Sequence, residues 1–167
     1  MRYTGFGDIL GTWWASIAVI LGATYFLLSY GEYTFLDAAD LVVHEAGHVF
    51  FAFFGEFIRF AGGTLMQILL PSALLWYFAI RSWTYGAQLS LFWMGQNLLN
   101  ISLYAADARA QKLPLLGGKM VQHDWAYMLG KLGLLEMDQI IGHFYVVLAI
   151  IAFIIAAVLP QFMLNMD

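Results

Sequence analysis

Five long apolar segments constrain the fold of this chain more than any other feature of its sequence. A helix needs about 20 mostly apolar residues to cross a bilayer. The 167-residue chain has runs of about that length at roughly 9–30, 36–57, 62–80, 83–109 and 138–159. We therefore expect an all-α, polytopic membrane helix bundle with about five transmembrane helices. It forms one integral membrane domain over residues 1–167, with an interfacial loop at 110–137.

The composition supports a lipid-embedded chain. Hydrophobic residues make up 62% of the sequence and charged residues only 11%, whereas a soluble domain carries about 25% charged residues. The net charge of −4 comes without a basic patch, which argues against nucleic acid as a partner. The chain has no cysteine, and this excludes disulfides, thiolate catalysis and cysteine-ligated metals.

The basic residues predict an orientation, because Lys and Arg concentrate on the cytoplasmic side of membrane proteins. With five crossings and the N-terminus inside, only Arg81 lies outside. The inner side then holds Arg2, Arg59, Arg109, Lys112, Lys119 and Lys131. The first apolar run lacks a small-residue cleavage site, so we expect it to be retained as a span. These features predict a bacterial inner (cytoplasmic) membrane protein with its N-terminus inside and its C-terminus outside.

The second segment contains the motif His-Glu-x-x-His in "DLVVHEAGHVFFAFFG". Such spacing puts His44 and His48 on one face of a helix, where both can ligate one zinc ion. Glu45 is rotated by about 100° from His44 and is placed to act as general base on a zinc-bound water. Each such polar group costs about 2.5–3.5 kcal/mol inside a membrane, which favours a metal site over the alternative, a buried polar cluster that joins helices.

The same helix face continues toward the N-terminus. Asp37, Asp40, His44 and His48 are separated by three or four residues, and these intervals keep them on one side of a helix. We expect Asp40 to accept the second ring N–H of His44, as carboxylates do for metal-bound histidines. Gly47 is small enough to permit close approach of a neighbouring helix.

A catalytic zinc site needs a third protein ligand, and the sequence leaves it open. The stretch "GQNLLNISLYAADARAQ" offers Asp107, and the following loop offers His123 and Asp124 in "QHDW". His143 lies in the last apolar segment. Asp124 has a second interpretation, as the cap of a short interfacial helix that begins near Trp125.

The segment "HEAGHVFFAFFG", followed by a glycine-rich turn and a later polar span, resembles the site-2 protease family of intramembrane zinc metalloproteases. The resemblance covers about residues 36–110. It implies that His44 and His48 are ligands, that Glu45 is catalytic, and that a later Asn…Asp span supplies the third ligand. The matching stretch "NLLNISLYAADA" then assigns Asn97 and Asp107. It departs from the family because no proline follows Asn97 and no glycine follows Asp107.

We therefore expect an intramembrane zinc metalloprotease that hydrolyses peptide bonds of a membrane-embedded protein substrate. Glu45 is the base, Asn97 or Asn100 holds the substrate or the oxyanion, and Asp107 is the third ligand, with His123 as the alternative. Asp107 lies nearer the membrane surface than His48. If Asp107 is the ligand, we expect segment 83–109 to be irregular near Asn100; otherwise segment 36–57 is displaced inward or another residue is the ligand. Two alternatives remain: a non-catalytic metalloprotease-like subunit of a larger membrane assembly or homo-oligomer, and a zinc hydrolase acting on a lipid amide.

Overall fold

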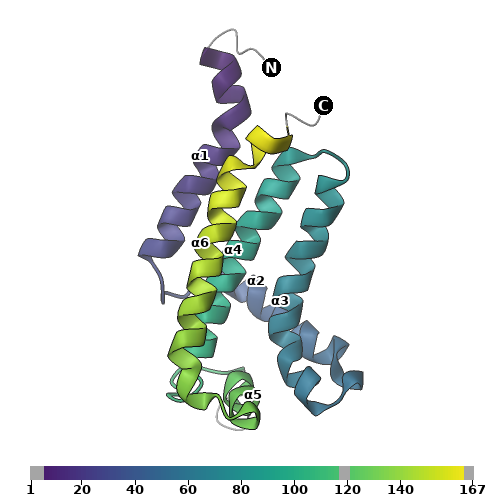
Figure 1. Ribbon diagram of the computed structural model, residues 1–167, viewed down its shortest axis with the longest axis vertical. Helices are drawn as coiled ribbons and strands as arrows, with labels where there is room; N and C mark the ends of the chain where they lie inside the picture. The colour runs from purple at the N-terminus through teal and green to yellow at the C-terminus, as the bar shows by residue number, and fades with distance from the viewer. Residues whose placement is uncertain (1–5, 117–120, 164–167) are drawn as a thin grey trace.

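The computed structural model describes residues 6–116 and 121–163, and its regular structure there is entirely helical (Figure 1). The α-helices are α1 (Phe6–Leu28), α2 (Phe35–Phe50), α3 (Glu56–Ala79), α4 (Thr84–Ala106), α5 (Asp124–Leu132) and α6 (Asp138–Met163). Two short 3-10 turns, η1 (Ala52–Phe54) and η3 (Leu135–Met137), precede α3 and α6. The expectation of an all-α fold is confirmed. Arg2 and Lys119, which we counted as inner basic residues, lie outside the described residues.

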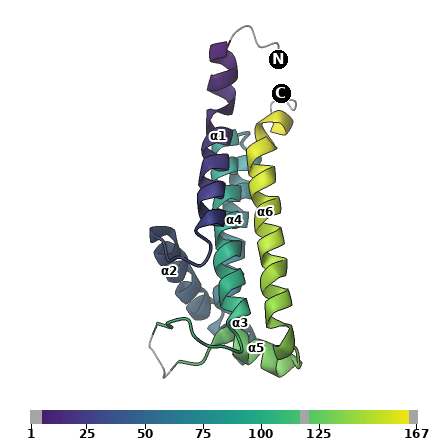
Figure 2. The ribbon, with the colours of Figure 1, turned by 90° about the vertical axis from the view of Figure 1, so that its left-hand side faces the viewer.

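Helix α4 is the centre of the bundle, with α1, α3 and α6 around it and α5 across one end (Figures 1 and 2). Small and apolar side chains allow close packing there. One core cluster joins Ala23 of α1, Leu98 of α4 and Phe153 of α6. A second cluster, which includes Ile101 and Trp125, fastens α5 beneath α4. The end of the bundle that carries α5 is therefore well packed, and the candidate site lies there.

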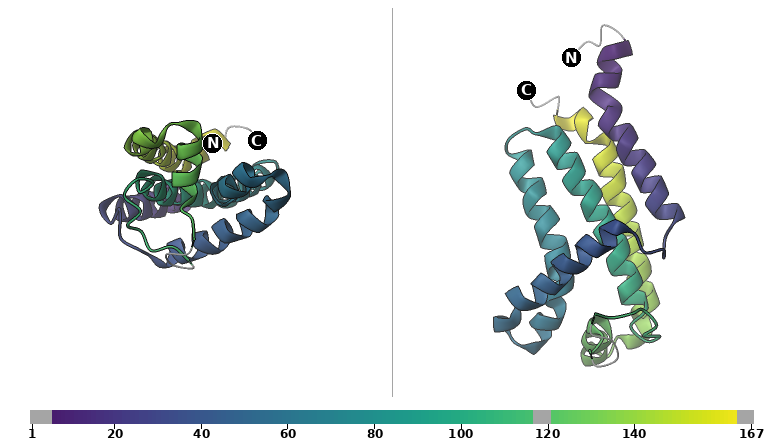
Figure 3. Two further views of the ribbon diagram at one scale, coloured as in Figure 1. Left: turned by 90° about the horizontal axis from the view of Figure 1, so that it is seen from below. Right: turned by 180° about the vertical axis from the view of Figure 1, so that it is seen from behind.

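Helix α2 does not run the length of the bundle. It has 16 residues, or about 24 Å at ~1.5 Å per residue, which is shorter than the ~30 Å apolar thickness of a bilayer. It runs obliquely from the region where α1 ends to the turn before α3 (Figure 3). The predicted segment 36–57 is broken because α2 ends at Phe50, and Gly55 takes a φ of 91° that starts α3.

Helices α1 and α2 thus follow one another along the bundle and together cover its length once (Figure 3). The Phe6 end of α1 and the Met163 end of α6 consequently lie at the same end of the bundle (Figure 1). Five full passages would have put them at opposite ends, so the expectation of opposed termini is wrong.

Within residues 6–116 and 121–163, two helical stretches are long and apolar enough to cross a membrane, Glu56–Ala79 and Leu135–Phe162. The apolar part of α1, Trp13–Leu28, is shorter. Helix α4 is long enough but carries polar side chains that are buried inside the bundle, such as Gln88, Gln96 and Asn97. By contrast, large apolar side chains of α1 and α6, among them Leu21 and Ile154, face outward.

Candidate metal centre

Glycine residues set the distance at which α2 crosses α3. A β-carbon on Gly47 would collide with the backbone carbonyl of Gly62, and one on Gly63 would collide with the imidazole of His44. Because these positions lack side chains, His44 packs directly against α3. The close approach expected at Gly47 is confirmed.

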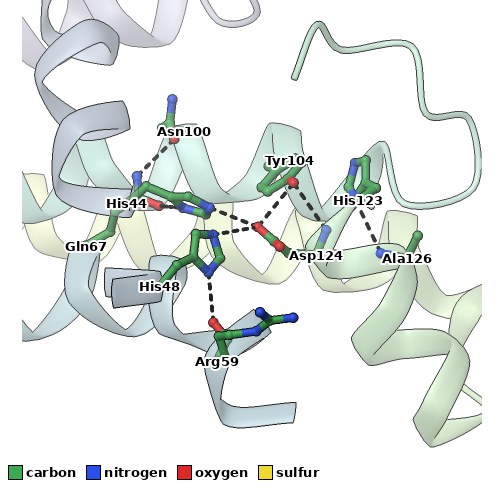
Figure 4. A network of polar contacts seen from close by, with 9 residues as sticks. All are labelled: His44, His48, Arg59, Gln67, Asn100, Tyr104, His123, Asp124 and Ala126. Atoms are coloured by element: carbon green, nitrogen blue, oxygen red, sulfur yellow. Dashed lines mark hydrogen bonds and ion pairs between the residues drawn. The ribbon is translucent and has the colours of Figure 1, made fainter. Parts of the chain in front are cut away.

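His44 is buried, and both of its ring nitrogens have partners. Its Nδ1 lies 2.9 Å from Oε1 of Gln67, and its Nε2 lies 2.9 Å from Oδ2 of Asp124 (Figure 4). The partner expected for the second ring nitrogen, Asp40, instead accepts a hydrogen bond from Nε1 of Trp93 at 2.8 Å. Asp40 lies one turn earlier on α2, where it faces α4, and Gln67 of α3 takes the role predicted for it.

His48 is oriented in the same way by the backbone. Its Nδ1 lies 2.8 Å from the carbonyl oxygen of Arg59, which can only accept a hydrogen bond. Its Nε2 is 3.2 Å from Oδ2 of Asp124. Both imidazoles therefore direct Nε2 at one carboxylate oxygen and hold Nδ1 against a protein acceptor (Figure 4). This is the arrangement that fixes the tautomer of metal-bound histidines.

Asp124 is the first residue of α5, and three features hold it toward the histidines. The ring of His123 caps the helix by accepting the backbone N–H of Ala126 at 3.3 Å. The hydroxyl of Tyr104 donates to Oδ2 of Asp124 and accepts its backbone N–H, both at 3.2 Å. Burial disfavours the charged carboxylate, but the hydrogen bonds from His44 and His48 outweigh it and lower the pKa of Asp124 to about 2.

His44, His48 and Asp124 form a group that could hold a metal ion. Their ligand atoms all lie within 4.8 Å of one another. Ligands bound at ~2.0–2.1 Å to a tetrahedral zinc ion lie about 3.3 Å apart, which is close to the 2.9 Å and 3.2 Å that separate Asp124 from the histidines. Two imidazole nitrogens and one carboxylate oxygen are also a donor set of catalytic zinc sites, which leave one position open.

The structure brings neither of the predicted third ligands, Asp107 and His123, into this group. Helix α4 is regular through Asn100 and ends at Ala106. The carboxylate of Asp107 therefore lies beyond the helix, where it accepts the backbone N–H groups of Lys112 and Leu113 at 2.9 Å. Asp124, which the sequence left as an alternative, takes the place predicted for Asp107.

His123 turns its ring away from the histidine pair. Its Nδ1 is the cap of α5, so Nε2 carries the proton and faces Oδ2 of Asp107 at 3.5 Å. Burial lowers the pKa of His123, so a neutral ring and not an ion pair makes this contact. His143, the remaining candidate, is exposed on α6.

The candidate base Glu45 lies beside the metal group. It lines a cavity of about 770 Å³ together with His44, His48 and Asp124. The cavity also contacts Asn100 and Tyr104. Asn97 does not line it; this side chain is fully buried and donates to the carbonyl of Trp93 at 3.1 Å. Of the two asparagines proposed to hold the substrate, only Asn100 reaches the cavity.

The walls of the cavity are mainly apolar. Leu41, Phe60 and Leu103 come from the helices, and Leu113, Leu115 and Leu116 come from the loop after α4. The volume is within the range of small-molecule sites, whose walls are also mainly apolar.

Two residues of the site were missed from the sequence, Gln67 and Tyr104. Each had a signal. Gln67 is the only amide side chain within the apolar segment 62–80, where such a group is costly and usually functional. Tyr104 follows Asn100 by four residues, which places both on one face of α4.

Comparison with protein-family models, curated proteins and solved structures finds no match for the chain. The functional argument therefore depends on the chemistry of the site itself. The similarity of "HEAGHVFFAFFG" to site-2 proteases stays a prediction.

Proposed function

We propose that the protein is an intramembrane zinc metalloprotease that hydrolyses a peptide bond of a membrane-embedded protein. The observation that carries the proposal is the convergence of His44, His48 and Asp124 beside Glu45 in one cavity. A polar cluster that only joined helices would not need to place a separate carboxylate in the adjoining cavity. For the same reason we favour an enzyme over a non-catalytic subunit.

Zinc is the metal that this donor set supports best. Imidazole nitrogen and carboxylate oxygen are its usual ligands in hydrolases, and three protein ligands leave a position for the reaction. When bound, zinc would supply an acidified water and a Lewis acid that polarises the scissile carbonyl.

Glu45 performs the proton transfers in this proposal. Its carboxylate is exposed to the cavity, one residue beyond a metal ligand. It takes one proton from the attacking water as the oxygen forms a bond to the carbonyl carbon. It then gives that proton to the amide nitrogen as the C–N bond breaks, so that a carboxylic acid and an amine leave and Glu45 returns to its starting state.

The substrate side of the cavity favours a peptide over a lipid amide. The apolar walls would accept apolar side chains from a membrane segment, and Arg59 and Asn100 at the cavity offer polar contacts to a peptide backbone. A fatty-acid amide would use the same walls, so it belongs in the same assay as the second substrate.

The membrane arrangement that fits the bundle has four passages: α1 with α2, then α3, α4 and α6. The α5 end carries the described basic residues Arg59, Arg109, Lys112 and Lys131, and the other end carries Arg81. Under the positive-inside rule, the α5 end and the metal site face the cytoplasm of a bacterial cell. The Phe6 and Met163 ends then face outward, which reverses the N-terminal orientation expected from five passages.

The experiment measures zinc content and hydrolysis on the same purified protein. We expect about one zinc per chain, lost in His44→Ala, His48→Ala and Asp124→Ala. Asp107→Ala is the matched control, a carboxylate at the same end of the bundle that keeps zinc. Glu45→Gln should keep zinc and lose hydrolysis of a quenched fluorescent transmembrane peptide in vesicles.

Three outcomes would contradict the proposal. A wild-type protein that binds no zinc would reject the metal site. Loss of zinc in Glu45→Gln as complete as in the histidine variants would reject the role of Glu45. Cleavage of a fluorescent fatty-acid amide, with the peptide left intact, would reject the peptide substrate and establish the lipid alternative.

A further inference from the structure

A chain of side-chain hydrogen bonds connects the start of α2 to the metal ligand His44 through two other helices. Oδ1 of Asp37 accepts from Nδ2 of Asn100 at 3.0 Å. Oδ1 of Asn100 accepts from Nε2 of Gln67 at 3.0 Å, and Oε1 of Gln67 lies 2.9 Å from Nδ1 of His44 (Figure 4). We call Asp37, Asn100 and Gln67 the amide relay. Its members come from α2, α4 and α3.

The polarity of the relay is fixed at Asp37. Oδ2 of its carboxylate accepts the backbone N–H and the hydroxyl of Thr34, both at 2.6 Å. Oδ1 accepts from Gln96 at 3.2 Å as well as from Asn100. Four donors thus surround the carboxylate, and its oxygens accept from each of them. Asn100 must therefore present its NH₂ group to Asp37.

The orientation of each later group follows from the one before it. With its NH₂ on Asp37, Asn100 presents oxygen to Gln67, so Gln67 presents NH₂ to Asn100 and oxygen to His44. An acceptor at Nδ1 requires a proton there. Nε2, which faces Asp124, is then the nitrogen that would give up its proton and offer its lone pair to a bound zinc ion. If the side-chain amide of Asn100 or of Gln67 were turned over, two N–H groups would face each other in the relay, and so would two oxygen atoms.

We infer that Asp37 sets the tautomer of the metal ligand His44 through the amide relay, with Gln67 as the positioning residue that touches the imidazole. The inference rests on the proposed metal site. Gln67 is 1% exposed, and a buried amide is costly unless its hydrogen bonds are made. His48 has no such dependence, because a backbone carbonyl that no substitution removes holds its Nδ1.

The first test measures zinc affinity by competition with a chromophoric chelator, on the full chain in detergent. Gln67→Leu removes the acceptor of His44, and Asp37→Asn removes the group that orders the relay. Each should weaken zinc binding about 10- to 100-fold, the usual effect of losing a partner of a metal-bound histidine. The absorption bands of bound Co²⁺ should change as well, which a purely structural role would not cause.

Gln88→Leu is the matched control. Gln88 is also 1% exposed, but its NH₂ group bonds Ser16 and the carbonyl of Ala156, away from the metal group. Its loss should lower stability and leave zinc affinity and the Co²⁺ spectrum unchanged.

The decisive variant moves the carboxylate along the relay. In Asp37→Asn/Gln67→Glu the carboxylate stands at position 67, where it accepts from Nδ1 of His44. The side chain of Asn100 turns over and donates its NH₂ group to this carboxylate. The new amide at position 37 then donates to the oxygen of Asn100. The Gln96 side chain can follow, because its buried oxygen has no partner. We expect zinc affinity within about threefold of wild type, well above that of Asp37→Asn alone. Coupling of this kind between residues of one network is measurable as non-additivity.

Two results would overturn the inference while leaving the metal site intact. In one, Gln67→Leu and Asp37→Asn bind zinc as tightly as wild type. In the other, the double variant is as weak as Asp37→Asn, which would assign the loss to a damaged start of α2. A wild-type chain without zinc affinity would instead reject the proposed function, and the inference with it.

Discussion

Replacing Gly63 by alanine tests the helix crossing on which the candidate metal centre depends. The new β-carbon would point from α3 at the imidazole of His44 and lie closer than 3.0 Å to three of its ring atoms. Ordinary contacts of a β-carbon begin at about 3.4 Å. The ring or the whole of α2 must therefore move by roughly 0.5–1 Å, as expected for overpacking in a close-packed interior.

A displacement of that size is large for a metal ligand. Zinc–nitrogen distances in functional sites stay within about 0.2 Å of their ideal value. Overpacking typically costs about 1–3 kcal/mol. If zinc binding forces the ring back against the new methyl group, that strain corresponds to about a 5- to 150-fold loss of affinity. The hydrogen bond from His44 to Gln67, 2.9 Å long, is strained at the same time.

The assay combines chelator competition for zinc with thermal unfolding of the metal-free protein. Gly95→Ala is the matched control, because its β-carbon would meet the ring of Phe153 at 2.6 Å, in the α4–α6 contact. We expect both variants to unfold at lower temperature and only Gly63→Ala to lose zinc affinity. Equal zinc affinity in Gly63→Ala and wild type would refute the placement of His44 against α3.

Three further predictions follow from the same geometry. Tyr104→Phe removes both hydrogen bonds to Asp124 and, at about 1 kcal/mol for each, should weaken zinc binding by at least about fivefold in the chelator assay; unchanged affinity would show that α5 positions Asp124 without Tyr104. The pKa of Asp124 is lowered from about 3.8 in the unfolded chain to about 2 in the fold, so its ionised carboxylate stabilises the metal-free fold above about pH 4. Thermal unfolding should show that the free energy of unfolding falls by about 2 kcal/mol between about pH 4 and pH 2. This part of the decrease should be absent in Asp124→Asn. The chain has no native cysteine, so an impermeant thiol reagent should label Ser82→Cys in intact cells and Glu136→Cys only after the membrane is opened; the reverse pattern would refute the proposed orientation.

The sequence predicts the parts of this molecule that depend on local patterns. Helical class and the bounds of most helices follow from apolar runs, and α3, α4 and α6 begin or end within a few residues of the predicted segments. His44, Glu45 and His48 come from a spacing that a helix fixes by itself. The break in segment 36–57 was missed because the residues before Gly55, "VFFAFF", are all apolar and contain no glycine or proline that would mark the end of α2 at Phe50.

The third member of the metal group was not predictable from spacing, because it depends on how the loop after α4 folds. Asp107 and Asp124 are both carboxylates at the ends of that loop. The carboxylate of Asp107 accepts hydrogen bonds from the backbone N–H groups five and six residues later, so it stabilises the loop and does not reach the histidines. Asp124 starts a helix, where the positive end of the dipole stabilises a carboxylate and the rigid backbone aims its side chain.

The polarity of α4 links the fold to the site. A helix that carries Gln96 and Asn100 is too polar to face lipid, so it occupies the centre of the bundle, and its polar groups need partners there. Asp37 and Asp40 of α2 supply them by accepting from Asn100 and Trp93. That contact fixes the rotation of α2 about its own axis. Because the histidines share the helix face of these two aspartates, the same rotation directs His44 and His48 past the end of α4 toward Asp124. Exchanging the aspartates for apolar residues would therefore disturb the metal group without touching any of its members.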